Sequence, residues 1–249
     1  MTGASGGIGA EVARQLGAAG ARVILVARTE SALETVAVEI RAGGGDARVV
    51  VADLEAPGAS EALVDRVGEP VDVLVANAGF GVRQAFAETD PETVRGMVTL
   101  NVHALTDLTR LLLPAMVERQ RGGVLTVASI AAFVPAPTLA VYAATKAYVL
   151  SLTDALHAEL RGSGVHATCL CPGPVRTGFG VRAGMAESFF AGRLSGVMTA
   201  EAVARAGLDG LARNRRRVVP GVVNRVQTAT ARLVPTGVSL RVARALLDR

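Results

Sequence analysis

This 249-residue chain has few of the side chains on which metal centres depend. It contains no Trp, two Tyr, two Cys and three His. Because the cysteines and histidines share no ligand spacing, we expect no metal site. No run approaches the roughly 18 uncharged apolar residues of a membrane-spanning helix, and the first residues lack the basic segment of a secretion signal. The sequence therefore predicts a cytoplasmic protein with no integral membrane segment.

Lysine is almost absent as well. Lys146 is the single lysine among 26 basic residues, and the other 25 are arginines. In such a chain, a lone lysine indicates a position where a compact ammonium is needed and a planar guanidinium does not serve. The net charge of +4 is too small to indicate a polyanion partner, so we expect no nucleic-acid binding. The basic run at 213–217 is interpreted as a solvated face, with docking of an acidic carrier domain or a phosphate-bearing substrate as the alternative.

Apolar residues, in contrast, are abundant and arranged in alternating patterns. Half of the chain is hydrophobic, and short β-branched runs alternate with longer stretches of helical periodicity, which predicts a mainly parallel sheet in one α/β domain. The expected strands are 22–27, 47–52, 71–76, 124–128, 165–170 and 217–219. The expected helices are 8–19, 31–42, 59–67, 91–119, 141–161 and 200–214, with a capping box at Ser31 and Glu34 and an N-cap at Asp90.

A glycine-rich segment opens the chain and leads directly into the first expected helix. Glycines let a backbone approach a pyrophosphate closely, and the free N–H groups at a helix start bind its charge. The residues expected to do so are Gly3, Ser5, Gly7, Ile8 and Gly9. A loop of this kind normally follows a strand, whereas only Met1 precedes Thr2, so we expect the natural start to lie upstream of Met1. A start at Met1 would leave backbone groups of the buried neighbouring strands unpaired, and a defective fragment is the alternative interpretation.

Arg28 ends the next expected strand, 19 residues after Gly9. An acidic residue at this position accepts hydrogen bonds from the ribose 2′-hydroxyl of NAD, whereas an arginine offers charge-assisted bonds to the 2′-phosphate of NADP. The sequence therefore favours NADP(H) over NAD(H) as the cofactor. A solvated arginine at a strand end is the alternative interpretation.

Three side chains with complementary proton chemistry follow later in the chain. Ser129 comes directly after an expected strand, and Tyr142 and Lys146 are four residues apart on one helix face. Tyrosine ordinarily titrates near ~10, so it exchanges protons at neutral pH only if its phenolate is stabilised. The Lys146 ammonium and an oxidised nicotinamide would lower the pKa of Tyr142, and Ser129 would hydrogen-bond a substrate carbonyl. This arrangement predicts proton transfer coupled to hydride transfer.

The chain resembles the short-chain dehydrogenase/reductase family in linked motifs that follow the family's order and spacing. They are Thr2 to Gly9, Asp53-Leu54, Asn77-Ala78-Gly79, Asn101, Ser129 with Tyr142 and Lys146, and Pro172 to Thr177. The resemblance implies a Rossmann-like, doubly wound α/β fold with seven parallel strands between two helical layers. It also implies an oxidoreductase that transfers hydride between nicotinamide and a ketone or secondary alcohol, in the direction of reduction if NADPH is the cellular cofactor.

The same resemblance implies roles for individual residues. Tyr142 would be the general acid/base, and Lys146 would bind the nicotinamide ribose and lower the tyrosine pKa. Ser129 would orient the carbonyl, and Asn101 would hold a water that connects Lys146 to solvent. Further cofactor contacts would come from Asp53, Leu54, Asn77, Ala78, Gly79, Pro172, Gly173, Val175 and Thr177.

Two C-terminal segments are expected to belong to this single domain of residues 1–249. Residues 179–197 are apolar and lie where the family has a mobile lid, which favours a hydrophobic carbonyl or alcohol substrate; a packed surface helix is the alternative. Residues 222–249 are expected to form an arginine-rich amphipathic tail that packs on the core or on another copy, with binding to a different partner or to a membrane surface as the alternative. The resemblance also implies a homo-oligomer formed through the helices 91–119 and 141–161. A non-catalytic NADP(H)-binding regulator or scaffold is the competing function.

Overall fold

The computed structural model describes residues 1–184, 196–231, 234, 237 and 240. Its strands are β1 (Arg22–Ala27), β2 (Asp46–Val51), β3 (Val73–Ala76), β4 (Gly122–Val127), β5 (Val165–Leu170) and β6 (Arg217–Val218). All of them pair in parallel, β1 with β2 in one sheet and β3-β4-β5-β6, in that order, in a second. Parallel pairing of such apolar strands, with helices between them in sequence, is the Rossmann-like α/β arrangement.

The first residues of the chain lie between the two sheets and connect them. The Met1 amino group donates to the Ile24 carbonyl at 3.0 Å, and the Val26 amide donates to the Met1 carbonyl at 2.9 Å. On the other side, the Thr2 amide donates to the Val75 carbonyl at 3.0 Å. The family resemblance implied seven strands, but the described residues form six, because at this position the chain makes only the single bridge from Thr2 to Val26.

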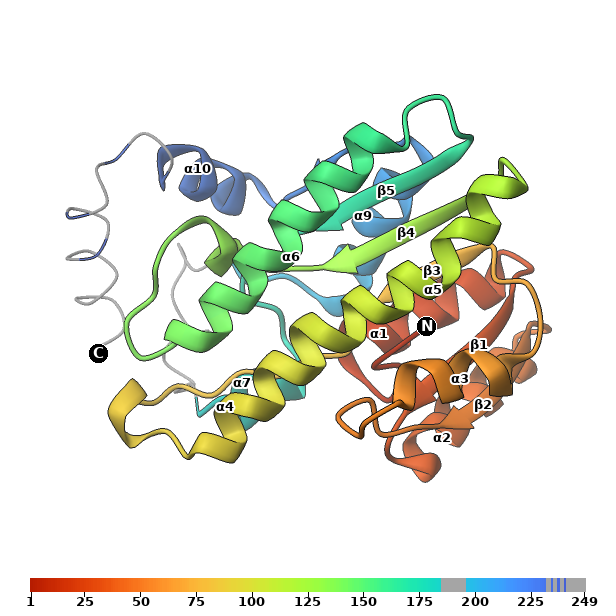
Figure 1. The fold of residues 1–249 in the computed structure, drawn as a ribbon, viewed down its shortest axis with the longest axis horizontal. Helices are drawn as coiled ribbons and strands as arrows, with labels where there is room; N and C mark the ends of the chain where they lie inside the picture. The colour runs from red at the N-terminus through yellow and green to blue at the C-terminus, as the bar shows by residue number, and fades with distance from the viewer. Residues whose placement is uncertain (185–195, 232–233, 235–236, 238–239, 241–249) are drawn as a thin grey trace.

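Helices cover both faces of the strands (Figure 1). On one face lie α1 (Gly7–Ala18), α2 (Glu30–Ala42) and α9 (Ala200–Ala212), and on the other α3 (Ala59–Val67), α5 (Leu105–Glu118) and α6 (Ala140–Glu159). The apolar core follows this division, because one cluster joins α3, α5 and α6 to the strands and two others join α1 to α2 and to α9. No helix in the described ranges is long and apolar enough to cross a membrane.

Two expected helix starts have different outcomes. The capping box at Ser31 and Glu34 is wrong: α2 begins at Glu30, after Thr29, whose side chain makes no capping bond, so Ser31 already lies in the first turn. The N-cap at Asp90 is confirmed, because its Oδ2 accepts a hydrogen bond from the Thr93 amide at 2.9 Å. A carboxylate followed by proline fixes a helix start more firmly than a serine in a run of good helix formers.

The helix expected over 91–119 is interrupted in its middle. α4 (Pro91–Val98) is followed by a π-helix at Thr99–Ala104, and α5 begins only at Leu105. A π turn adds a residue to the helical repeat, so the side chains within it face a direction that regular helical spacing does not give. Asn101 lies in this turn and is 1% exposed. The interruption therefore brings an amide side chain into the interior.

The C-terminal part contributes two more described helices, α7 (Gly178–Arg182) and α10 (Val222–Ala231). Of the lid expected at 179–197, residues 185–195 lie outside the described residues, as do 232–233, 235–236, 238–239 and 241–249 of the expected tail. In α10, the described helix of the expected tail, Val222 and Val226 are exposed, whereas Asn224 and Thr228 are buried, so these valines do not pack on the core of the described residues.

Candidate active site

A crevice of about 790 Å³ opens at the carboxyl ends of the strands, between the glycine segment and α7. This edge is where open parallel sheets bind ligands. Of the site residues expected from the sequence, Gly9 and Asn101 do not border the crevice. The others line it: Gly3, Ser5, Gly7, Ile8, Arg28, Asp53, Leu54, Asn77, Ala78, Gly79, Ser129, Tyr142, Lys146, Pro172, Gly173, Val175 and Thr177.

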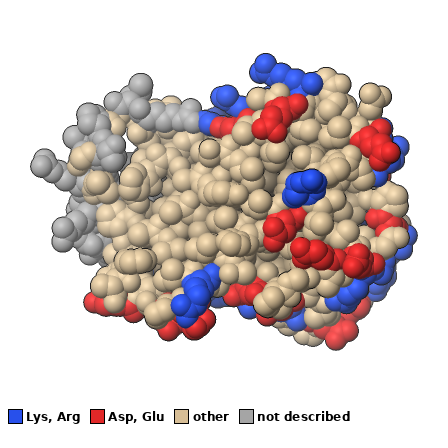
Figure 2. All heavy atoms as spheres, in the orientation of Figure 1, with Lys and Arg blue, Asp and Glu red and all other residues tan. Residues whose placement is uncertain are grey.

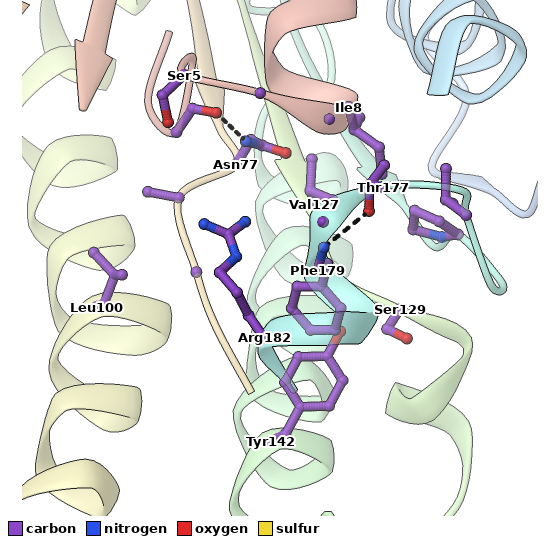
Figure 3. Close-up of a pocket in the computed structure, with 18 of the residues that line it drawn as sticks. Ser5, Ile8, Asn77, Leu100, Val127, Ser129, Tyr142, Thr177, Phe179 and Arg182 are labelled. Atoms are coloured by element: carbon purple, nitrogen blue, oxygen red, sulfur yellow. Dashed lines mark hydrogen bonds between the residues drawn. The ribbon is translucent and has the colours of Figure 1, made fainter. Parts of the chain in front are cut away.

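The glycine segment packs tightly against the end of β3 (Figure 3). The Asn77 Nδ2 donates to the carbonyl oxygens of Thr2 and Gly3, each at 3.1 Å. A Cβ at Gly9 would lie 2.1 Å from the Gly3 carbonyl oxygen, so this position requires glycine. Gly6 precedes α1, and no side chain of the described residues caps this helix. The first N–H groups of α1 therefore lack a side-chain acceptor, which is the arrangement that binds anions at helix starts.

Ser129, Tyr142 and Lys146 converge at the other end of the crevice. Ser129 follows β4, and Tyr142 and Lys146 lie one turn apart on α6. Tyr142 is 8% exposed and Lys146 is 5% exposed, and the Lys146 Nζ lies 5.7 Å from the centre of the Tyr142 ring. Nζ also donates to the Val127 carbonyl at 2.9 Å. The structure thus brings together the three side chains expected to carry the chemistry, in surroundings with little water.

Burial shifts both titrating groups of this cluster toward their neutral forms. It raises the pKa of Tyr142 to about 12, and a hydrogen bond with Ser129 offsets only part of this shift. It lowers the pKa of Lys146 to about 8, with a smaller opposing Coulombic effect from Cys169 and Cys171. The sequence predicted a lowered pKa for Tyr142. Without a bound cofactor, the pKa of Tyr142 is raised instead, because the free-energy cost of burying a phenolate exceeds the stabilisation by its neighbours.

Asn101 supports the cluster from behind the crevice lining. Its Nδ2 donates to the Phe80 carbonyl at 2.9 Å and to the Thr145 Oγ1 at 3.0 Å, and its Oδ1 accepts from the Phe80 amide at 3.0 Å. A Cβ at Gly79 would lie 2.8 Å from the Asn101 Oδ1 and 3.3 Å from the Lys146 Nζ. Asn101 therefore fixes the backbone segment that passes beside the ammonium.

α7 forms the wall beside Tyr142 and contributes residues that the sequence did not identify individually (Figure 3). Thr177 caps this helix by accepting a hydrogen bond from the Phe179 amide at 3.3 Å. The Phe179 ring packs on Tyr142, with the ring centres 5.5 Å apart. Arg182 extends its guanidinium back into the crevice. In a chain with 25 arginines, nothing in the sequence distinguishes Arg182 from the others.

The opposite end of the crevice carries a pair of charges. Arg28 directly follows β1 and lines the crevice together with Asp53. Its Nη1 lies 2.9 Å from the Glu55 Oε1, in an ion pair that the sequence analysis missed. Glu55 is one residue beyond the Asp53-Leu54 motif, and only the three-dimensional structure places it beside Arg28.

Other residues considered in the sequence lie away from the crevice. Cys169, in β5, and Cys171, just beyond its end, are buried, and their Sγ atoms are 3.7 Å apart. His157 and His166 each bond to a backbone carbonyl at 2.9 Å. Arg217, from the basic run, pairs with an aspartate of α6. None of these residues lines the crevice.

In comparison with known proteins, the chain matches dehydrogenases and reductases. A family model described as short chain dehydrogenase matches residues 1–187. Ketoacyl reductase HetN of Nostoc sp. is 34% identical over 223 residues, which cover 88% of this chain and 76% of that protein. A very-long-chain 3-oxoacyl-CoA reductase of Phaeosphaeria nodorum is 37% identical over 180 residues, covering 68% of this chain. The matched region is 52% of that second relative.

Solved structures agree with the sequence relatives. A short-chain dehydrogenase from Sphingobium yanoikuyae, in complex with NADPH, superposes with a TM-score of 0.83 at 31% identity, covering 89% of this chain and 87% of that one. A 3-ketoacyl-(acyl-carrier-protein) reductase from Brucella melitensis, complexed with NADH, gives a TM-score of 0.77 at 29% identity, covering 88% and 94%. Both forms of the dinucleotide thus occur among similar structures.

Proposed function

The chain belongs to the short-chain dehydrogenase/reductase family, enzymes that act on CH–OH and C=O groups, and we propose that it uses NADPH to reduce hydrophobic ketones. This proposal rests on one observation. Ser129, Tyr142 and Lys146 line the same crevice as the glycine segment at the start of α1. Proton donors and an anion site therefore lie within reach of one bound dinucleotide and its substrate.

The residues of the crevice fit a nicotinamide dinucleotide. The uncapped start of α1 offers N–H groups to a pyrophosphate, and the absence of a Cβ at Gly3 and Gly9 keeps the segment compact. We assign the adenosine half to Arg28, Asp53 and Leu54, and the nicotinamide half to Tyr142, Lys146, Pro172, Gly173, Val175 and Thr177, with Asn77, Ala78 and Gly79 between them. When bound, the nicotinamide supplies the hydride for reduction.

In this proposal, Tyr142 is the acid that protonates the substrate oxygen. The hydride goes to the carbonyl carbon, and the phenolic proton goes to the carbonyl oxygen, which yields an alcohol. A pKa raised to about 12 keeps Tyr142 protonated at neutral pH in the protein without cofactor, so release of its proton requires that the Lys146 ammonium and the bound nicotinamide stabilise the phenolate. The Ser129 hydroxyl donates a second hydrogen bond to the same oxygen and stabilises its developing charge.

Lys146 restores the proton of Tyr142 in this scheme. Its pKa of about 8 leaves it mainly charged at neutral pH, yet close enough to neutrality to release a proton. Asn101 is assigned as the residue that positions this relay, because its amide fixes the backbone beside the Lys146 ammonium. A water held near Asn101 would connect the ammonium to solvent.

Apolar side chains near Tyr142 support a hydrophobic substrate. Leu139, Phe179 and Val181 line the crevice on this side. The names of the relatives point in the same direction, since they include a ketoacyl reductase and a very-long-chain 3-oxoacyl-CoA reductase. We therefore propose a ketone with a long or bulky apolar substituent, within reach of the expected lid at 179–197.

Turnover with a panel of ketones tests the proposed activity. The purified protein should consume NADPH, seen as loss of the nicotinamide absorbance, with at least one apolar ketone of the panel. Tyr142→Phe should abolish this turnover while NADPH binding, measured by calorimetry, is retained. Tight NADPH binding without turnover of any ketone would instead support the competing function, a non-catalytic regulator or scaffold. Unchanged turnover in Tyr142→Phe would refute the role given to the phenol.

The cytoplasmic location and the oligomeric state expected from the sequence stay predictions. Figure 2 shows that charged side chains gather over the half of the molecule built from β1, β2 and α3, whereas the surface over α5 and α6 is mainly uncharged. On these two helices, Leu111, Val117 and Tyr148 are about two-fifths exposed. This face supports the proposal that copies associate through α5 and α6, which light scattering of the purified protein would test.

A further inference from the structure

Glu55 places a negative charge where the 2′-phosphate of NADP(H) is expected to bind. Arg28, the residue assigned to that phosphate, is paired with Glu55 at 2.9 Å between Nη1 and Oε1. Both side chains line the crevice. The cation that would select NADP(H) therefore already has an anionic partner.

The position of this carboxylate is fixed by its surroundings. The Glu55 amide donates to the Asp53 Oδ1 at 3.0 Å, which holds the turn after β2. The carboxylate itself packs against α4 at Gly96, where a Cβ would lie 2.6 Å from the Glu55 Oε2. With a side chain at that position, the carboxylate would have to move. The Glu55 side chain is 25% exposed, compared with 62% for Arg28, so Glu55 is the more constrained partner.

We propose that Glu55 is a specificity-determining residue that adapts the adenosine end of the crevice to both NADPH and NADH; this rests on the proposed function. A carboxylate accepts hydrogen bonds from a ribose 2′-hydroxyl, as an acidic residue does in NAD-binding folds. Here the acid comes from the turn after β2, and an arginine occupies the end of β1. The pair thus presents an acceptor for the hydroxyl of NADH and a donor for the phosphate of NADPH.

The two nucleotides use this pair in opposite ways. A bound 2′-phosphate competes with Glu55 for Arg28 and is repelled by the carboxylate, so Glu55 weakens NADPH binding. A 2′-hydroxyl has no charge, so it donates to Glu55 and leaves the ion pair intact. Because exposed ion pairs are weak, the phosphate can still displace Glu55 from Arg28. Glu55 therefore reduces the preference for NADPH without eliminating NADPH binding.

Glu55→Gln tests this inference because it removes the charge and keeps the size of the side chain. Isothermal titration with 2′,5′-ADP and 5′-ADP measures the affinity of the adenosine end of the crevice without any turnover. The same titration with NADPH and NADH then measures the affinity for the whole nucleotides. We expect the ratio of affinities to shift toward the 2′-phosphorylated ligand by about tenfold. The shift should shrink when salt is raised from about 50 to about 300 mM, because the repulsion is screened.

Glu69→Gln is the matched control. Glu69 also pairs with an arginine, Arg22, at 2.9 Å, and its side chain is 31% exposed, but it lies at the amino end of β1, away from the crevice. This variant should leave both affinities unchanged. An unaltered ratio in Glu55→Gln, or an equal shift in Glu69→Gln, would overturn the inference. If the wild-type protein binds neither NADPH nor NADH, the proposed function fails instead, so the two failures are distinguishable.

Discussion

The two ends of the crevice differ in how far their charged side chains are exposed to water. At the adenosine end, Arg28 and Glu55 are partly exposed and keep their charges in contact with water. At the reaction end, Tyr142 and Lys146 are buried, and burial shifts the pKa of each toward its neutral form. Water screens interactions at the first end, whereas burial reduces that screening at the second. We therefore expect large effects on rate from changes at the reaction end, and smaller effects on affinity from changes at the adenosine end.

After the loss of turnover expected from Tyr142→Phe, the largest effect is expected from Ser129→Ala, which removes a hydrogen-bond donor from the buried end. Loss of one such donor to a developing oxyanion lowers kcat by about a hundredfold or more. NADPH affinity should stay within a factor of about two, because Ser129 is assigned to the substrate oxygen and not to the nucleotide. Steady-state kinetics and calorimetry measure the two quantities.

Ser129→Thr serves as the conservative control, because it keeps a hydroxyl. Ser129 also accepts a hydrogen bond from the Ala131 amide at 3.1 Å, so thermal unfolding should be recorded for both variants. If kcat falls equally in the threonine and alanine variants while stability is unchanged, the assigned role of the hydroxyl is wrong.

Gly9→Ala probes the segment that joins the two ends. The added Cβ would lie 2.1 Å from the Gly3 carbonyl oxygen and 2.6 Å from the Asn77 Nδ2, so backbone must shift. Overpacking of this kind costs about 3 kcal/mol of the free energy of unfolding, and NADPH binding should weaken with it. Urea unfolding and calorimetry check both. Gly43→Ala is the control, since its Cβ would come no closer than 3.4 Å to its neighbours; equal destabilisation by both changes would contradict the steric argument.

Residue patterns within single strands, helices and turns predicted much of this architecture, because each pattern reflects a packing requirement of its own element. The strands β1 and β5 have the expected bounds because a largely apolar run of strand length can be buried on both faces of a sheet. Tyr142 and Lys146 could be paired from the sequence because four-residue spacing on a helix fixes their relative direction. The glycine segment was identifiable because only glycine tolerates the close approach found at Gly9.

Other features depend on contacts between segments far apart in the chain. The π-helix that turns Asn101 inward interrupts only six residues of the stretch 91–119, whose periodicity predicted a single continuous helix and did not indicate it. Glu55 and Arg28 come from turns after different strands and meet only in the folded sheet. The raised pKa of Tyr142 depends on how deeply the ring is buried, which no short motif specifies.

A pH-dependent term in stability is expected from Lys146. Its pKa is about 8 in the folded protein and 10.5 for a free lysine, so between these values the unfolded chain binds more protons and stability rises with pH. From pH 8 to pH 9.5 this group should add about 2 kcal/mol to the free energy of unfolding. Lys146→Met should lack that increment, which urea unfolding at the two pH values would measure. Equal pH dependence in both proteins would show that the lysine is not held in a buried, charge-disfavouring position.

The smallest effect is expected from Arg28→Ala, at the exposed end. The guanidinium is 62% exposed and already paired with Glu55, so its net contribution to 2′-phosphate binding is limited by solvent screening and by that competition. We expect NADPH affinity to fall by about fivefold, with NADH affinity and kcat almost unchanged. Titrations at low and high salt check this, because the loss should diminish as ionic strength rises. A loss of a hundredfold that did not respond to salt would mean that the adenosine end closes over its ligand and excludes water, and the contrast between the two ends would then disappear.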